Sequence, residues 1–104
     1  MIPSSLRSFI SDLQDATENG KLKWLATDNN AFYCNHKNYT LHILYHFDEE
    51  KEMGAYYFRI VVDKNATPFA VTEEEDDYNK LRNLYEAIAA NANNIEEKLK
   101  GFFD

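Results

Sequence analysis

The side chains that most resemble a set of zinc ligands are those of Cys34, His36, His42 and His46, because thiolate and imidazole groups commonly bind zinc. Their spacing argues against a metal site. His42 and His46 belong to residues 38 to 47, whose two-residue alternation predicts a strand. The two histidines are four residues apart, which is about 13 Å along an extended strand. Zinc holds its ligand atoms at about 2.0–2.3 Å. We therefore expect no metal ion and no cofactor.

Cys34 is also the only nucleophile that the sequence singles out, and its predicted neighbours are Phe32, Tyr39 and Leu22. A reactive thiol needs a nearby base and an exposed setting that favours the thiolate. The apolar neighbours predict a buried, inert thiol instead. As the only cysteine, it excludes an internal disulfide and suits a reducing compartment.

Acidic side chains gather in two runs, Asp48 to Glu52 and Glu73 to Asp77. General acid and base catalysis needs carboxylates in a cleft that shifts their pKa values, whereas both runs are typical of solvated surface. The second run precedes a helical pattern, where negative charge offsets the positive end of the helix dipole. The alternative is an acidic surface that recognises a basic partner. With only three glycines, no Gly-rich phosphate loop can form, so we expect no catalytic residue and no enzymatic activity.

Length and charge restrict the class of protein further. The 104 residues predict a single domain, and the net charge of −7 argues against nucleic acid as a partner, because phosphate binding needs clustered Lys and Arg. No apolar run approaches the roughly 20 residues that cross a bilayer, so no membrane association is expected. The sequence opens without a secretion signal, and we expect a cytoplasmic protein.

The predicted sheet that positions these residues is built on two alternating stretches, residues 38 to 47 and Tyr56 to Asp63. Each has one strongly apolar set of side chains and one mixed set, which predicts the central hairpin of an antiparallel sheet. Shorter strands are expected at residues 22 to 26, 31 to 35 and 68 to 72. Pro68 cannot donate to a ladder and predicts an edge. The sheet should be a five-stranded meander.

Two helical patterns flank the sheet. The first is capped by Ser4 or Ser5 and ends at Asn19 and Gly20, residue types that favour a left-handed turn. The second begins near Tyr78 and should break between Asn91 and Asn93, before a short last helix. Its apolar stripe consists of Tyr78, Leu81, Leu84, Tyr85, Ile88, Ala92, Ile95, Leu99 and Phe102. The predicted fold is α+β, with all helices on one face of the sheet.

The expected turns set the pairing of the strands. The turns would be centred on His36 and Lys37, on the charged loop after residue 47, and on residues 63 to 67. Two-residue periodicity requires the apolar sets of neighbouring strands to stay together. The pairs predicted in this way are Phe32 with Leu41, Cys34 with Tyr39, Ile43 with Phe58, Leu44 with Tyr57, His42 with Arg59, Thr40 with Val61, and Ile60 with Val71.

The apolar sides of both helical segments are expected to pack on the sheet face that carries Ile43 and Phe58. The other face of the sheet is then left open to solvent. The side chains expected on this open face are Tyr33, His42, Leu44, Tyr57, Arg59 and Val61. A contiguous exposed apolar area often marks a partner site, and Tyr and Arg are common in interface hot spots. We predict that this face, alone or with the acidic surface, binds another protein or a second copy of the chain. The alternative for the face is a half-polar sheet surface in water.

A second function is compatible with the sequence, namely binding of a small ligand between the sheet and the helices. The aromatic side chains expected to line that pocket are Trp24, Tyr39, Tyr45, Tyr56 and Tyr85. Core packing explains the same residues without a ligand.

Three short segments carry a resemblance: residues 20 to 24 (Gly-Lys-Leu-Lys-Trp), 84 to 87 (Leu-Tyr-Glu-Ala) and 96 to 99 (Glu-Glu-Lys-Leu). They are similar to segments of a group of small uncharacterised bacterial α+β proteins. The similarity covers the two ends of the chain and not its middle. It implies an α+β fold and a bacterial origin, and it implies no activity.

Overall fold

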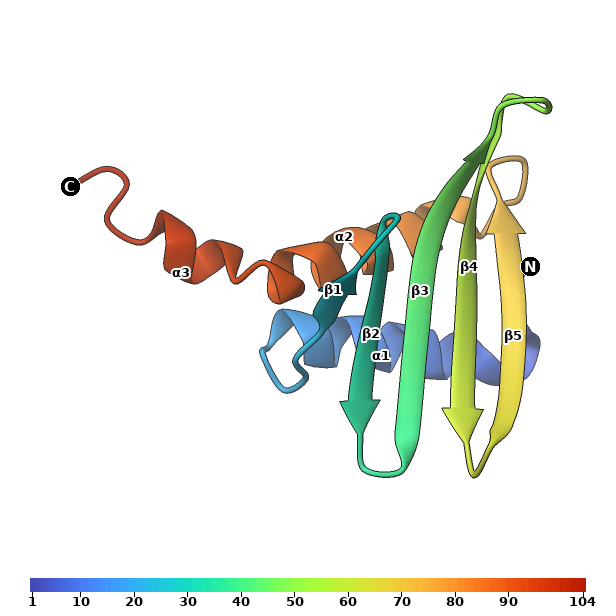
Figure 1. Ribbon diagram of the computed structural model, residues 1–104, viewed down its shortest axis with the longest axis horizontal. Coiled ribbons are helices and arrows are strands. Elements are labelled where there is room, and N and C mark those ends of the chain that lie inside the picture. The colour runs from blue at the N-terminus through green and yellow to red at the C-terminus, as the bar shows by residue number, and fades with distance from the viewer.

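The computed structural model describes all 104 residues and has two layers, a sheet and a layer of helices behind it (Figure 1). The sheet is antiparallel, with its five strands in chain order, and is therefore the predicted meander. Its strands are β1 (Leu25–Thr27), β2 (Ala31–His36), β3 (Tyr39–Asp48), β4 (Met53–Val62) and β5 (Asn65–Thr72). β5 forms one edge, as Pro68 predicts, and the three-residue β1 forms the other.

The helices are α1 (Arg7–Glu18), α2 (Tyr78–Ala92) and α3 (Ile95–Leu99), and a 3₁₀ turn, η1 (Ser4–Leu6), precedes α1. Neither Ser4 nor Ser5 caps the helix, because both belong to η1. Gly20 adopts a φ of 73° after α1, which confirms the predicted helix end. α2 ends at the predicted break, and Asn94, in the left-handed region with a φ of 52°, separates it from α3.

The core lies between the sheet and the two long helices. Ile43, Phe58 and Leu41 on the sheet are each less than 5% exposed, as are Leu81 and Ile88 on α2. Ile60 is partly buried against the same cluster. The apolar sets of β3 and β4 therefore point toward the helices, as the two-residue period predicts.

The central hairpin has the predicted pairing, with Ile43 opposite Phe58, Leu44 opposite Tyr57 and His42 opposite Arg59. The pairing of the two outer hairpins was predicted wrongly. Phe32 lies opposite Ile43 rather than Leu41, because Lys37 takes a φ of 56° and lets a two-residue turn, Lys37–Asn38, join the strands. Cys34 consequently lies opposite Leu41 rather than Tyr39.

The turn between β4 and β5 is also shorter than expected. Asp63 and Lys64 both have positive φ, which is the geometry of a type I′ hairpin turn. Val62 therefore pairs with Asn65, and Ile60 lies opposite Thr67 rather than Val71. Both errors shift a strand by an even number of residues, so every side chain keeps its predicted face.

A single side chain, that of Asn91 in α2, ties the segment before the sheet to the helices. Its Oδ1 accepts the Trp24 backbone N–H at 2.8 Å, and its Nδ2 donates to the carbonyls of Leu22 at 2.8 Å and Thr17 at 3.2 Å. The indole N–H of Trp24, a fully buried residue, donates to the Thr17 hydroxyl at 3.0 Å. These bonds satisfy polar groups beside the core that would otherwise be costly to bury.

The acidic run before α2 is used within the fold. Asp77 accepts two bonds from the Arg7 guanidinium, each 2.9 Å, and one from the Ile2 backbone N–H. Glu75 accepts the Thr72 backbone N–H at 2.7 Å. In the other run, Asp48 accepts backbone N–H groups of its own loop, from Glu50 and Lys51. None of the helices is both long and apolar enough to cross a membrane.

Candidate docking surface on the open sheet face

All six residues predicted for the open face project from its three central strands, away from the helices. Three cross-strand rows place them together, with Leu44 beside Tyr57, His42 between Tyr33 and Arg59, and Thr40 beside Val61. Leu44 is 36% exposed and Tyr57 44% exposed, whereas Tyr33, His42 and Val61 are half-buried. The structure therefore brings together the whole predicted set.

A shallow hollow of about 440 Å³ lies on this face. Leu44, Tyr57 and Ala70 line it in one row, and His42, Arg59 and Pro68 line it in the next. Pro68 and Ala70 of β5 join the six predicted residues on this face. Both follow from strand parity once the two-residue turn at Asp63 and Lys64 is known.

The electrostatics of the hollow depend on His42 and Arg59. Burial lowers the pKa of His42, and the positive charge of Arg59 lowers it further. His42 is therefore neutral at neutral pH, and Arg59 carries the charge at the centre of an otherwise apolar area. None of the six residues is acidic, although the whole chain has a net charge of −7.

The edges of the sheet are less available to a partner than its open face. Pro68 removes one backbone donor from β5, and the amino group of Met1 donates to the Ala70 carbonyl at 2.9 Å. At the other edge, β1 has only three residues. Short edges and prolines oppose strand-to-strand association, so neither edge of this sheet is well suited to pairing with another strand.

Cys34 and the histidines do not form a reactive or metal-binding cluster. Cys34 is 1% exposed on the core side, where burial raises the pKa of its thiol. His42 lies on the opposite face and pairs with Tyr33, with 6.2 Å between ring centroids. No group of three or more His, Cys, Asp and Glu side chains in the structure has the geometry to hold a metal ion.

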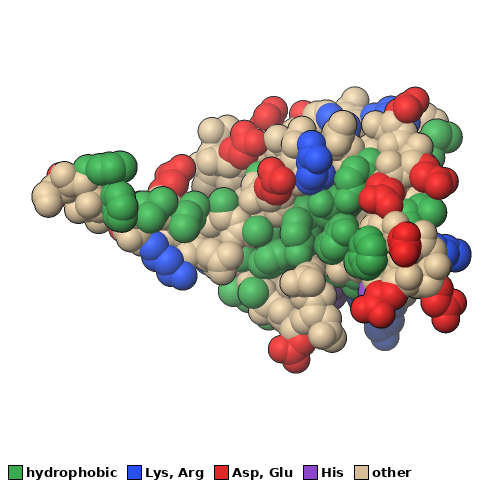
Figure 2. All heavy atoms as spheres, turned by 90° about the horizontal axis from the view of Figure 1, so that it is seen from above, with side chains coloured by type: hydrophobic (Ala, Val, Ile, Leu, Met, Phe, Trp, Pro, Cys, Tyr) green, Lys and Arg blue, Asp and Glu red, His purple; other side chains and the backbone are tan.

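Three of the five aromatic residues predicted for a ligand pocket do converge. Tyr45, Tyr56 and Tyr85 meet between the sheet and α2, with 5.1 Å between the rings of Tyr45 and Tyr56 and 5.3 Å between those of Tyr56 and Tyr85. Tyr78 joins them at 5.2 Å from Tyr56. Figure 2 shows apolar side chains gathered at this end of the molecule, between the sheet and the helix layer.

The remaining two residues of that prediction lie elsewhere. Trp24 is fully buried beside Thr17, and Tyr39 is 44% exposed at the opposite end of β3. Within the cluster the rings contact one another, burial raises the pKa of Tyr56, and the Tyr85 hydroxyl donates to the Asn30 carbonyl. The cluster is therefore a packed aromatic core with a partly exposed rim.

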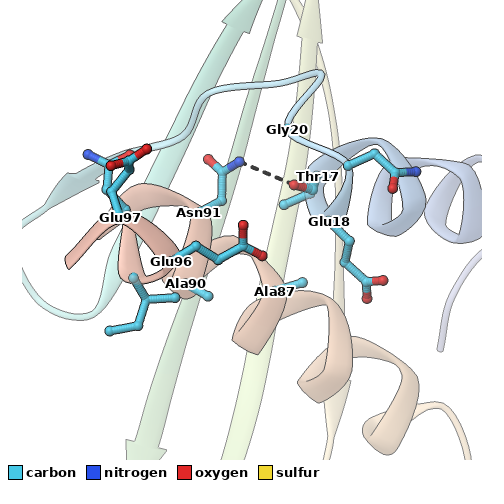
Figure 3. A pocket seen from close by; sticks show the side chains of 11 residues that line it. Thr17, Glu18, Gly20, Ala87, Ala90, Asn91, Glu96 and Glu97 are labelled. Carbon is cyan, nitrogen blue, oxygen red and sulfur yellow. Dashed lines mark hydrogen bonds between the residues drawn. The ribbon is translucent and has the colours of Figure 1, made fainter. Parts of the chain in front are cut away.

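A second hollow, of about 350 Å³, lies where the C-terminal ends of α1 and α2 meet α3 (Figure 3). Its rim carries Glu18, Glu96 and Glu97, whose carboxylates do not converge on one point. The Lys23 ammonium donates to the Asn91 carbonyl at 2.9 Å and to Asn94 Oδ1 at 2.6 Å. The C-terminal end of α2 beside this hollow is therefore already bound by a positively charged side chain of the protein itself. We interpret the hollow as a structural junction.

Beyond this junction, residues 95 to 104 project from the body past β1 (Figure 1), and we call them the C-terminal arm. Its apolar side chains continue the α2 stripe but are exposed, by 39% for Ile95, 55% for Leu99, 70% for Phe102 and 96% for Phe103. Figure 2 shows hydrophobic side chains along an arm that stands clear of the body. Periodicity indicates the stripe, and only the structure shows that the body does not cover it.

Comparison with protein-family models, with curated proteins and with solved structures gave no match. The function of the chain is therefore argued from its own geometry.

Proposed function

We propose that this protein is a non-enzymatic interaction module of the bacterial cytoplasm, and that it binds a protein partner through the open face of its sheet. The observation that carries the proposal is the Leu44 and Tyr57 row beside Arg59, uncovered because both long helices lie on the other face. Such a surface has the composition of an interface centre, namely aromatic and aliphatic area around an Arg. The bacterial setting follows from the resemblance, and the cytoplasm from the single buried thiol.

The acidic surface contributes less to this proposal. Asp77 and Glu75 bind groups of the chain itself, and Asp48 binds its own loop. Carboxylates used in this way are less free to recognise a basic partner.

A matched pair of tyrosine variants tests the proposal. Tyr57 and Tyr39 are each 44% exposed, but Tyr57 lies on the open face and Tyr39 on the other side of the sheet. Immobilised wild type and Tyr39→Glu should recover the same stoichiometric protein from a bacterial lysate to which soluble copies of this chain have been added, whether that protein is a lysate protein or the added chain. Tyr57→Glu should recover it more than about tenfold less well, since losing a hot spot costs 2 kcal/mol or more.

Circular dichroism and thermal melting of each variant would show that the fold survives. Equal recovery by Tyr57→Glu and wild type would overturn the proposal.

A small-ligand binder is the alternative, supported by the convergence of Tyr45, Tyr56 and Tyr85. A ligand that binds the folded state raises the melting temperature in proportion to its occupancy. Thermal shift against a panel of metabolites tests it, with Tyr45→Ala as the variant that should lose any shift. An unchanged melting temperature across the panel would count against this alternative.

A further inference from the structure

The open sheet face and the C-terminal arm both leave apolar side chains uncovered. The arm presents Leu99, Phe102 and Phe103 to solvent, and the face presents Leu44 and Tyr57. Large exposed apolar areas are uncommon on proteins that act alone. We propose that the two surfaces cover each other between two copies of this chain, with the arm of each copy lying across the open sheet face of the other. This inference rests on the proposed function and names the partner of that face.

The arm lies away from the open face of its own chain (Figure 1). It leaves from the end of α2, in the layer behind the sheet, and runs outward beyond β1 (Figure 1). Its exit is fixed, because Asn94 adopts the left-handed conformation and its side chain accepts a bond from Lys23. An arm held in this direction extends into the space that a second copy of the chain would occupy. If a two-fold axis relates the two copies, the arm of the neighbour lies on the first copy in the same way, and the result is a closed dimer.

The area available suits a stable dimer. Aromatic side chains bury about 150–250 Å² each, so the four exposed apolar residues of the arm present on the order of 400 Å². Two exchanged contacts, each covering an arm and an equal area of a face, would remove on the order of 1,600 Å² from water. This is the size of an ordinary specific protein interface.

Charge also favours this pairing. The open face has Arg59 at its centre and no carboxylate among its six residues. The arm has an excess of negative charge beside its apolar row, with three carboxylates (Glu96, Glu97 and Asp104) against two lysines (Lys98 and Lys100). An arm seated on the face would bring carboxylates near a guanidinium in partly desolvated surroundings. Two open faces packed against each other would instead bring two Arg59 charges together. Exchange of arms is therefore the better match.

The test is complementation between an arm variant and a face variant, read as mass by light scattering after size-exclusion chromatography over a concentration series. Wild type should approach twice the 12.2 kDa of one chain at high concentration. Leu99→Glu damages the arm and Tyr57→Glu damages the face, so each alone should stay at the mass of one chain. Tyr39→Glu, equally exposed on the other side of the sheet, should behave as wild type.

Mixing the two damaged variants is the decisive step. The Tyr57→Glu chain still has an intact arm, and the Leu99→Glu chain still has an intact face, so the mixture should regain part of the two-chain species through one good contact. No recovery on mixing would overturn the exchange, because it is the result expected of face-to-face or arm-to-arm pairing.

Other outcomes separate this inference from the proposed function. A wild type that stays at one chain mass at every concentration overturns the exchange and leaves the face free for a different protein. A dimer that Leu99→Glu leaves intact and Tyr57→Glu abolishes overturns the role of the arm and supports the face. A dimer that Leu99→Glu abolishes and Tyr57→Glu leaves intact places the arm on another surface and contradicts the exchange.

Discussion

Asn91 shows how much of the fold depends on one polar side chain. Its amide makes three hydrogen bonds, to Trp24, Leu22 and Thr17, and these hold the chain between α1 and β1 against α2. The sequence predicted Asn91 only as a poor helix former near a break. Its role was not predictable, because it depends on carbonyls 69 and 74 positions away in the chain.

Replacing Asn91 by Ala should lower the free energy of unfolding by about 2–3 kcal/mol, since three bonds are lost and partly buried backbone groups remain unpaired. Urea denaturation would measure the change. Asn83→Ala is the control on the same helix, because Asn83 is exposed and Ala is the better helix former. The control should be neutral or slightly stabilising. An equal loss in both variants would show that helix propensity, and not the hydrogen bonds, governs the effect.

Gly54 is a second residue whose importance comes from one neighbour. A Cβ at this position would come within 2.9 Å of the Tyr45 ring, which packs against Tyr56 and is not free to move away. Gly54→Ala should therefore destabilise the protein by about 1–3 kcal/mol, the range for overpacking a core. The cost should largely vanish in a Tyr45→Ala background, and a double-mutant cycle would measure this coupling.

Gly20→Ala separates the steric effect from the conformational one. Gly20 has open space around it but a φ of 73°, so the substitution should cost about 1 kcal/mol through backbone strain. That cost should not depend on Tyr45. Coupling of Gly20 to Tyr45 as strong as that of Gly54 would contradict the assignment.

Among the elements, α1 and α2 are joined at their first turns by Arg7 and Asp77. The Arg7 guanidinium lowers the pKa of Asp77 below its ordinary value of 3.8, and the Ile2 N–H lowers it further. The folded protein thus binds this proton less readily than the unfolded chain. The resulting stabilisation is complete above pH 3.8 and is lost as the pH falls through the lowered pKa.

Asp77→Asn should therefore lower stability at neutral pH and flatten the loss of stability on acidification. Urea midpoints measured from pH 7 down to about pH 2.5 would show this, across the range in which carboxylates titrate. Asp76→Asn, at the exposed neighbouring position, should keep the wild-type slope. Parallel curves for wild type and Asp77→Asn would mean that the ion pair contributes no pH dependence.

The elements themselves were largely predictable from the sequence, and their pairing only in part. The central hairpin was correct because its two alternating stretches, residues 38 to 47 and Tyr56 to Asp63, leave little freedom of pairing. The outer hairpins were wrong because a lysine in each turn, Lys37 and Lys64, adopts positive φ, which lysine seldom does. Slips of two residues between β2 and β3 and of four between β4 and β5 preserve the faces of a strand, so each side chain kept its predicted face while the pairing across the outer hairpins was wrong.

For the whole molecule, the arm adds surface without adding to the core. α3 has no buried residue, and all ten arm residues are exposed. A chain lacking residues 95 to 104 should thus unfold within about 0.5 kcal/mol of the full chain under dilute conditions, as surface changes usually do. At high protein concentration only the full chain should gain thermal stability, because association stabilises the folded state by mass action.

Differential scanning calorimetry over a range of protein concentrations would measure both parts. A large loss of stability on truncation at low concentration would show that the arm supports its own body, which the exposed side chains argue against.

The buried Cys34 has a practical consequence for such experiments. It is the sole thiol of the chain and is 1% exposed, so a maleimide dye should leave the native protein unlabelled. A cysteine introduced on the arm outside its apolar row, as in Lys100→Cys, would then be the one reactive position. Fluorescence energy transfer between such a dye and a second one on the sheet of a differently labelled copy would report the approach of two molecules in real time.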